Sequence, residues 1–115
     1  MHSSPRFLQG MYEFTGQGMQ KPFLIDPALS YLVPLGTTAQ PLYFRGGNGT
    51  GEMVTVVLMR DGAPMRLFPI GARGAVHVPL RVVEDLLGDT RLELHVVAPE
   101  GCAGVLSVDF GLVEI

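Results

Sequence analysis

Short runs of β-branched and aliphatic residues recur along this chain, and glycine or proline falls in the stretch after almost every run. The spacing of the runs is roughly ten residues, which is typical of the strands of an all-β sandwich or barrel. The 115 residues include 15 glycines and 9 prolines, and this frequent interruption leaves no room for a long amphipathic helix. A chain of this length forms at most one domain.

Alternation of apolar with polar or small residues supports the last predicted strands best. In 104–115, Leu106, Val108 and Phe110 alternate with polar or small residues, which indicates one buried and one exposed face. We expect one short helical turn at 81–87, because Gly88 follows it and would end it. The predicted strands are 30–35, 40–45, 52–60, 65–70, 75–80, 90–98 and 104–115.

These strands predict a single-domain antiparallel β-sandwich of about seven or eight short strands over residues 30–115. The pattern has a general likeness to immunoglobulin-like sandwiches. It lacks the paired cysteines and the tryptophan of antibody domains, since the chain has one cysteine and no tryptophan. The likeness concerns the fold alone and implies no function.

Residues 1–29 differ from the rest of the chain. They hold several glycines and prolines without a period, and the aromatic content is too high for a solvated tail. We interpret this segment as an extended N-terminal arm that docks either on its own domain or on a neighbouring subunit. The aromatic residues expected at such a contact are Phe7, Tyr12 and Phe14.

The charge of the chain is low and unevenly distributed. The net charge is −3, so there is no basic excess for nucleic acid, and no apolar run is long enough for a membrane-spanning helix. Residues 45–81 carry five arginines against two acids, and residues 82–115 carry one arginine against seven acids. Strands of opposite sign could attract each other within one domain, or they could steer one subunit onto another.

Two observations predict a protein partner. Only 17% of the residues are charged, against about 25% in a typical domain, so apolar surface remains uncovered. The run 54–59 is apolar on both faces, so it is either a central strand or a strand whose outer face meets a partner. We expect a homo-oligomer or a complex with another protein subunit, with an interface that includes Val54, Val56, Val57 and Met59.

The glycine-rich stretch 44–53, FRGGNGTGEM, lies between two predicted strands. It lacks the lysine and the following helix of a phosphate-binding loop. Asn48-Gly49 is instead a preferred pair for a two-residue hairpin turn, because both positions tolerate positive φ. We therefore predict a turn that joins two strands rather than an anion site.

A small-molecule or metal-binding domain, even an enzyme, is the alternative function. Glu93, His95 and Asp109 on the predicted polar faces could together hold a divalent metal ion such as zinc. Arginine binds carboxylates and phosphates through two parallel hydrogen bonds, so an acidic ligand would favour an arginine cluster. The candidates for such a site are Arg60, Arg66, Arg73 and His77.

The chain shows no catalytic motif, and we predict neither a catalytic residue nor a cofactor. Cys102 has no neighbour in the sequence that would lower its pKa, so it is not expected to act as a nucleophile. A single cysteine and the lack of a signal peptide predict a cytoplasmic protein. The function predicted from the sequence is a non-enzymatic self-associating interaction module or accessory subunit.

Overall fold

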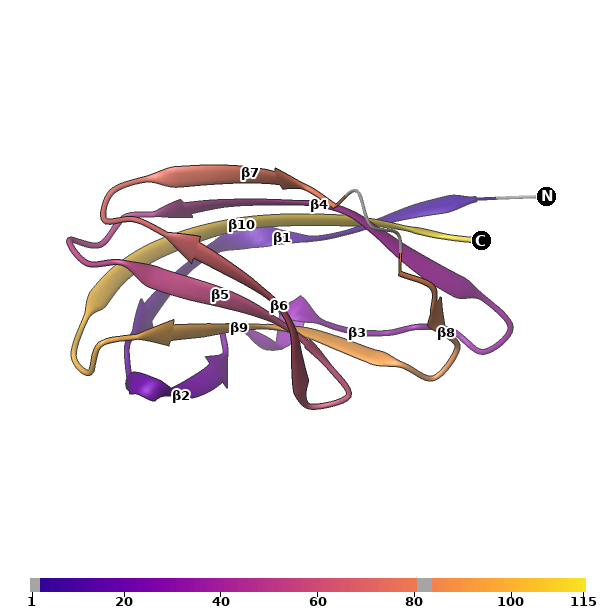
Figure 1. Cartoon of the computed structure of the whole chain (residues 1–115), viewed down its shortest axis with the longest axis horizontal. Coiled ribbons are helices and arrows are strands. Elements are labelled where there is room, and N and C mark those ends of the chain that lie inside the picture. The colour runs from indigo at the N-terminus through magenta and orange to yellow at the C-terminus, as the bar shows by residue number, and fades with distance from the viewer. Residues whose placement is uncertain (1–2, 81–83) are drawn as a thin grey trace.

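The computed structural model describes residues 3–80 and 84–115, which form two antiparallel sheets packed face to face (Figure 1). Sheet A runs in the order β1 (Ser4–Thr15), β10 (Ala103–Glu114), β4 (Thr38–Asn48) and β7 (Ala75–Pro79), with the short β8 (Leu86–Leu87) also on β4. Sheet B runs in the order β2 (Gly18–Leu24), β9 (Arg91–Ala98), β5 (Val54–Arg60) and β6 (Ala63–Ile70), with β3 (Ser30–Leu32) also on β9. A 3-10 turn, η1 (Pro27–Leu29), precedes β3. The predicted antiparallel β-sandwich is confirmed.

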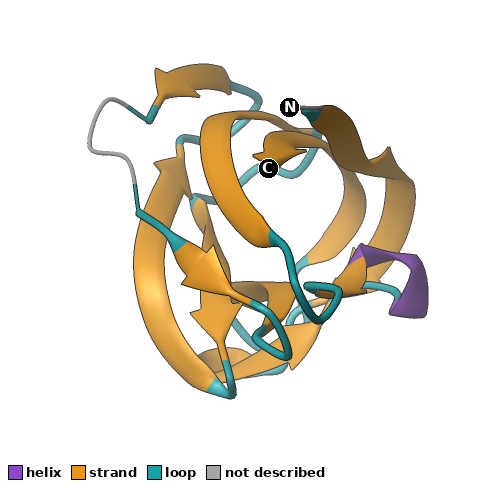
Figure 2. Cartoon of the chain, turned by 90° about the vertical axis from the view of Figure 1, so that its right-hand side faces the viewer, coloured by secondary structure: helices purple, strands orange, loops and turns teal. Residues whose placement is uncertain are grey.

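The strand order is that of a jelly roll. The first strand pairs with the last, and the chain passes repeatedly from one sheet to the other. The architecture of two packed antiparallel sheets is shared with immunoglobulin-like sandwiches, but the order in which the strands are connected is different. Figure 2 shows how the strands of the two sheets curve around a common interior.

The core fills the space between the sheets with alternate side chains from both. Phe44 of β4 stacks on Phe68 of β6, with ring centroids 4.3 Å apart and an angle of 7° between the planes. This pair joins sheet A to sheet B, because each ring belongs to a different sheet. On β10 the predicted inward residues are buried, which confirms the alternation expected there. The largest fully buried side chains include Phe44, Phe110, Leu29, Leu58, Ile70, Leu86, Leu92, Leu94, Leu106 and Leu112.

The N-terminal segment contributes a strand to each sheet. β1 pairs with β10 over its whole length, from Ser4 opposite Glu114 to Thr15 opposite Ala103. Phe14 is buried in the core and Tyr12 packs against it, so the described part of the predicted arm docks on its own domain. The start of β1 at Ser4 and the end of β10 at Glu114 consequently lie side by side at one end of the molecule (Figure 1).

The helical turn predicted at 81–87 falls partly on residues 81–83, which lie outside the described residues. In the described part, Leu86 and Leu87 form β8 and pair with Ala39 and Thr38 of β4. Leu86 is fully buried whereas Leu87 is exposed, an alternation that suits a strand. The helix prediction is therefore wrong for these two residues. Among the described residues, no helix has the length and apolar character that a membrane crossing requires.

The glycine-rich stretch forms a passage between the sheets and not a hairpin. Asn48 remains in β4 opposite Leu106, and the chain then crosses from sheet A to β5 in sheet B. The buried Asn48 amide donates from Nδ2 to the carbonyl oxygens of Glu52 at 2.7 Å and of Ile70 and Gly71 at 3.1 Å each. Its Oδ1 accepts from the Thr50 backbone N–H at 2.8 Å and from Thr50 Oγ1 at 2.7 Å. The side chain is used to satisfy buried backbone groups. The stretch joins two strands, as predicted, but not through a tight hairpin turn.

Asn48→Ala should lower the free energy of unfolding by roughly 3 kcal/mol, because it leaves buried carbonyl groups without their donor. Urea unfolding at neutral pH measures this loss. Gln20→Ala, at an exposed position of β2, serves as the control and should change stability by less than about 0.5 kcal/mol. A loss below about 1 kcal/mol in Asn48→Ala would show that the amide is not the structural centre of this passage.

Candidate functional site

The outer face of sheet A carries a row of polar side chains that crosses four strands. Gln9 of β1 lies opposite Asp109 of β10, Asp109 opposite Arg45 of β4, and Arg45 opposite His77 of β7. We call Gln9, Asp109, Arg45 and His77 the polar row. Residues directly opposite each other on neighbouring strands are within contact distance, so the pairing of the strands brings the four side chains of the polar row together.

Tyr43 organises the centre of the polar row. Its hydroxyl donates to Asp109 Oδ1 at 2.9 Å, and the Arg45 guanidinium carbon lies 5.1 Å from the ring centroid. The His77 ring meets the Tyr43 ring edge-on, with centroids 6.2 Å apart. The ring can lie across β10 only because Gly111 has no side chain, since a Cβ there would stand 2.2 Å from Tyr43 Cε2.

The electrostatics of this cluster keep Tyr43 a hydrogen-bond donor. Partial burial raises the pKa of the Tyr43 phenol above its usual value, and the hydrogen bond to Asp109 raises it further. Arg45 opposes this effect but does not cancel it. Among the ion pairs of the described residues, none joins Arg45 to Asp109. Both charges therefore remain available to a group that approaches the face.

A shallow hollow of about 310 Å³ lies beside the polar row. Its floor is made of small residues from three strands, Gly47, Ala75 and Ser107, and Arg45 and Asp109 stand at its margin. Gly47, Ser107 and Ala75 are consecutive partners in the register, on β4, β10 and β7. The hollow is thus a row of small side chains next to a row of charged ones.

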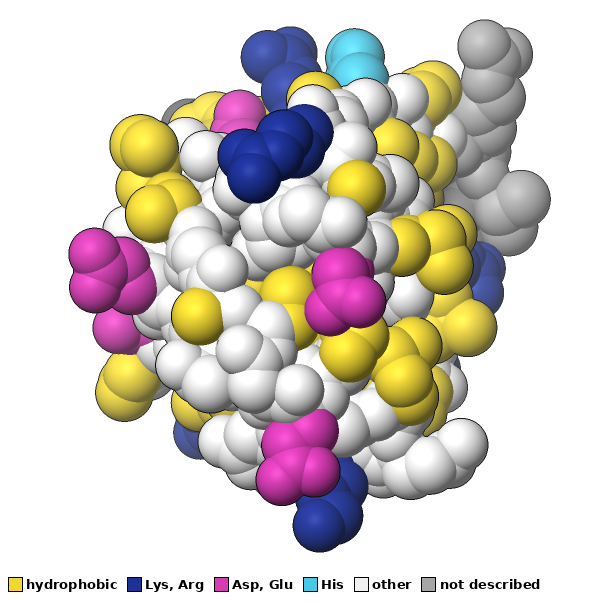
Figure 3. Space-filling view, turned by 90° about the vertical axis from the view of Figure 1, so that its left-hand side faces the viewer, with side chains coloured by type: hydrophobic (Ala, Val, Ile, Leu, Met, Phe, Trp, Pro, Cys, Tyr) yellow, Lys and Arg dark blue, Asp and Glu magenta, His cyan; other side chains and the backbone are white. Residues whose placement is uncertain are grey.

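Apolar side chains on β1 border the same face. Phe7 is 53% exposed and Met11 is 73% exposed, and both are on the side of β1 that carries Gln9. Val105 of β10, 37% exposed, extends this surface. Figure 3 views one end of the molecule, where basic side chains and a histidine stand on the sheet A side and hydrophobic ones gather along the flanks.

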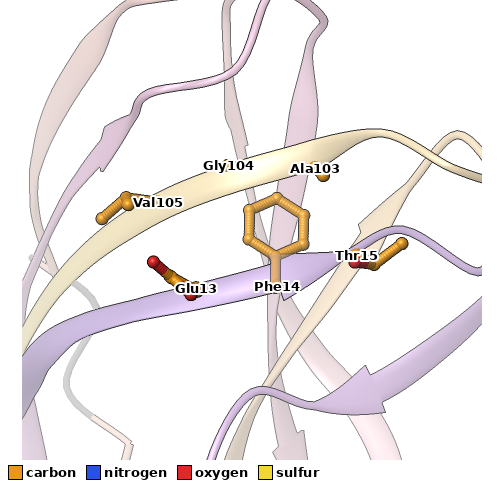
Figure 4. Close-up of a pocket in the computed structure, with 6 residues that line it drawn as sticks. All are labelled: Glu13, Phe14, Thr15, Ala103, Gly104 and Val105. Atoms are coloured by element: carbon orange, nitrogen blue, oxygen red, sulfur yellow. The ribbon is translucent and has the colours of Figure 1, made fainter.

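Two other hollows offer less chemistry. One of about 550 Å³ lies at the end of the β1–β10 pair, where Glu13 is the charged side chain (Figure 4). The other, of about 460 Å³, lies between β6 and β7 and includes Arg66. Arg66 is already engaged in an ion pair with Glu84.

The predicted arginine site is not assembled. Arg60 is at the end of β5 that pairs with Ala63, whereas Arg73 follows β6 at the opposite end of that hairpin. Arg73 lies over the glycine-rich passage, with Nη1 3.5 Å from the Gly49 carbonyl oxygen. Of the four residues predicted, His77 is the one that belongs to the polar row.

The predicted metal ligands are divided between the two sheets. Glu93 and His95 project from β9 in sheet B, with Nε2 of His95 3.0 Å from Oε1 of Glu93, whereas Asp109 is on sheet A. In the described ranges, no group of three or more His, Cys, Asp or Glu side chains is placed to hold a metal ion. The pKa of Glu93 is lowered mainly by its hydrogen bond with His95, although burial opposes this, and Ser30 Oγ adds a hydrogen bond at 3.2 Å.

The predicted interface residues of β5 are internal. Val54 and Val56 are fully buried in the core, and the outward-facing Val57 and Met59 are only 4% and 7% exposed. β5 lies between β9 and β6, so its two-sided apolar pattern is that of a central strand already shielded within one chain. Phe7 is the exposed member of the predicted set.

The sequence interpretation named His77 and Asp109, in different candidate sites, and missed Gln9 and Arg45. The segment 40–47 alternates, so Tyr43, Arg45 and Gly47 could have been placed on one face of a strand. Their partners could not, because alternation says nothing about which residue of another strand lies opposite.

Solved structures with the same fold belong to different kinds of protein. The CBM36-1 domain of a multidomain xylanase from the hindgut metagenome of Trinervitermes trinervoides is 18% identical over 96% of each chain, with a TM-score of 0.57. A carbohydrate-binding module CBM36 in complex with calcium and xylotriose is 14% identical over 94% of this chain and 97% of that one, with a TM-score of 0.58. The VP2 subviral particle of infectious bursal disease virus is 10% identical over 97% of this chain and 32% of that one, with a TM-score of 0.52. No protein-family model and no curated protein matches the sequence.

Gly111→Ala should displace the Tyr43 ring and bring the pKa of its phenol back toward the ordinary 10.0. Absorbance titration of tyrosinate measures this change, with Tyr43→Phe identifying the contribution of Tyr43. Gly47→Ala is the matched control on the same face, because its Cβ would meet Ser107 at an ordinary 3.6 Å. Identical titrations of the wild type and Gly111→Ala would contradict the arrangement.

Glu93→Gln should destabilise the protein in a pH-dependent way. The pKa of Glu93 is lower in the folded chain, so its charge stabilises the fold above the ordinary pKa of 4.5. This contribution is lost as the pH falls through the lower folded value. Unfolding free energies of both proteins should therefore converge in acid, and Ser30→Ala should reduce the gap at neutral pH. A difference that is constant from neutral to strongly acidic pH would disprove the role of Glu93.

Proposed function

We propose that this protein is a non-enzymatic, self-associating interaction module, and that the outer face of sheet A is its binding surface. The observation that carries the proposal is the placement of Phe7 and Met11, exposed and apolar, beside a prearranged polar row. Exposed apolar surface bordered by polar groups is typical of a protein interface. A cytoplasmic location stays a prediction.

The energetics favour a protein partner on this face. Full burial of a methionine or phenylalanine side chain contributes about 1.5–3 kcal/mol, so Phe7 and Met11 supply a driving force that the isolated chain does not use. Arg45 and Asp109 supply opposite charges for recognition. The same fold occurs in the VP2 subviral particle, which provides a precedent for a jelly roll in an assembly.

A small polar ligand in the hollow is the second candidate. Arg45, Asp109 and Ser107 offer a guanidinium, a carboxylate and a hydroxyl around a floor without bulky side chains. These groups suit a ligand that carries hydroxyl or carboxylate groups. One protein of the same fold is a carbohydrate-binding module in complex with calcium and xylotriose. Native mass spectrometry separates the two functions, because it reports subunit number and any retained ligand mass together.

Met11→Asp should weaken self-association at least about tenfold, since it places a carboxylate where an apolar contact is expected. Sedimentation equilibrium between about 1 and 500 µM measures the dissociation constant. Met19→Asp on β2 is the matched control, because Met19 is also exposed, at 51%, but belongs to sheet B.

The control variant should associate as the wild type does. A wild-type protein that remains monomeric over the whole range would overturn the proposed function. Equal association of Met11→Asp and the wild type would place the interface elsewhere.

A further inference from the structure

We infer that the partner is a second copy of this chain, and that the two sheet A faces pack about a two-fold axis running along the strands between β10 and β4. The inference rests on the proposed function, in which the chain associates with itself, and adds the symmetry axis and the register. Its basis is that the outer face of sheet A is complementary to itself, in both charge and side-chain size.

The strand order determines what such an axis brings together. Rotation about a line between β10 and β4 reverses the order β1-β10-β4-β7, so that β10 lies over β4 of the second copy and β1 over β7. Positions along the strands are preserved, so each cross-strand row meets itself in reverse. Asp109 then faces Arg45 of the second copy, and Arg45 faces its Asp109.

The charges favour this axis over the perpendicular two-fold axis in the plane of the interface. A two-fold axis running across the strands would keep each strand over its own copy, and along the polar row Asp109 would meet Asp109 and Arg45 would meet Arg45. Like charges that face each other disfavour association, whereas the first axis produces an alternating square of two carboxylates and two guanidiniums. Within each copy neither charge forms an ion pair with the other among the described residues.

The sizes of the neighbouring side chains agree with the same axis. The next row along the strands is Met11, Ser107, Gly47 and Ala75, so its reversal puts the exposed Met11 over Ala75, at the edge of the hollow. In the row on the other side, the reversal puts Phe7 over Pro79, and the two Tyr43 rings, each lying across Gly111 of its own chain, meet at the centre. The exposed apolar side chains of β1 thus meet the smaller side chains of β7.

The area of the face sets the expected strength. Four strands about 4.8 Å apart, of which β7 has five residues, offer roughly 450 Å² per copy, below the about 800 Å² of a standard interface. The dimer should therefore dissociate on dilution. Sheet twist turns the outer rows away from strict alignment, so the central Asp109–Arg45 contacts define the register best.

Charge reversal tests the register directly. Asp109→Arg alone would place four arginines at the centre of the dimer, and Arg45→Asp alone would place four aspartates there. Each single variant should therefore raise the dissociation constant at least about tenfold. A mixture of the two restores every opposite-charge contact and should form a heterodimer, which native mass spectrometry distinguishes from either homodimer by mass.

Two outcomes would overturn the inference in different ways. If the wild type forms dimers but each variant dimerises equally well, the register is wrong while self-association stands. If the wild type is monomeric up to about 500 µM, both this inference and the proposed function fail.

A second pair of variants avoids the Tyr43 hydrogen bond, in case charge reversal at Asp109 prevents folding. Ala75→Arg places a long charged side chain opposite Met11 of the second copy and should weaken the dimer at least about tenfold. Ala63→Arg, at an exposed position on β6, is the control and should dimerise like the wild type. Equal dissociation constants for these two variants would overturn the proposed register.

Discussion

The side-chain amide of Asn48 fixes the point at which the chain leaves one sheet for the other. It binds carbonyl groups on both sides of the crossing, at Glu52 in the passage and at Ile70 and Gly71 where β6 ends. Buried polar groups that are fully satisfied act as rigid, directional links, whereas apolar contacts tolerate sliding. This link places β4 against β6, and the stacking of Phe44 on Phe68 depends on that placement. The same strand, β4, also positions Tyr43 and Arg45 on the outer face of sheet A.

The glycines of sheet A shape its surface by two different means. Gly111 makes room for a large ring to lie flat across a neighbouring strand, and that ring positions Asp109 through its hydroxyl. Gly47 carries no such ring and leaves a depression between charged side chains. The lack of a side chain at Gly111 therefore fixes the position of a neighbouring ring, whereas the lack of one at Gly47 leaves a depression in the surface. The two glycines thus give the sheet face raised and hollow regions, and a surface of this shape can discriminate between partners.

Period-two patterns were sufficient to predict the sandwich and most of its strands from Ser30 onward, because long strands such as β4 and β10 bury alternate residues. They were insufficient for the site, which depends on register. Asp109 and His95 both face outward on consecutive strands joined by a short loop, yet those strands belong to different sheets, so the predicted metal ligands are separated. Asn48-Gly49 has the composition of a tight turn, but a buried amide with five hydrogen bonds outweighed the local preference. The first strands were missed because Gly10, Gly16 and Gly18 obscure their alternation.

The pairing of β1 with β10 builds one side of sheet A from strands that are far apart in the sequence. During synthesis β1 emerges first and has no partner until β10 has been made, so sheet A is completed last. Contacts that distant in sequence slow folding, because a long loop must close before they form. Until then β1 and β4 each present an unpaired edge, which is the state most prone to join a strand from another chain. A jelly roll of this kind is thus most exposed to misassembly while it is being made.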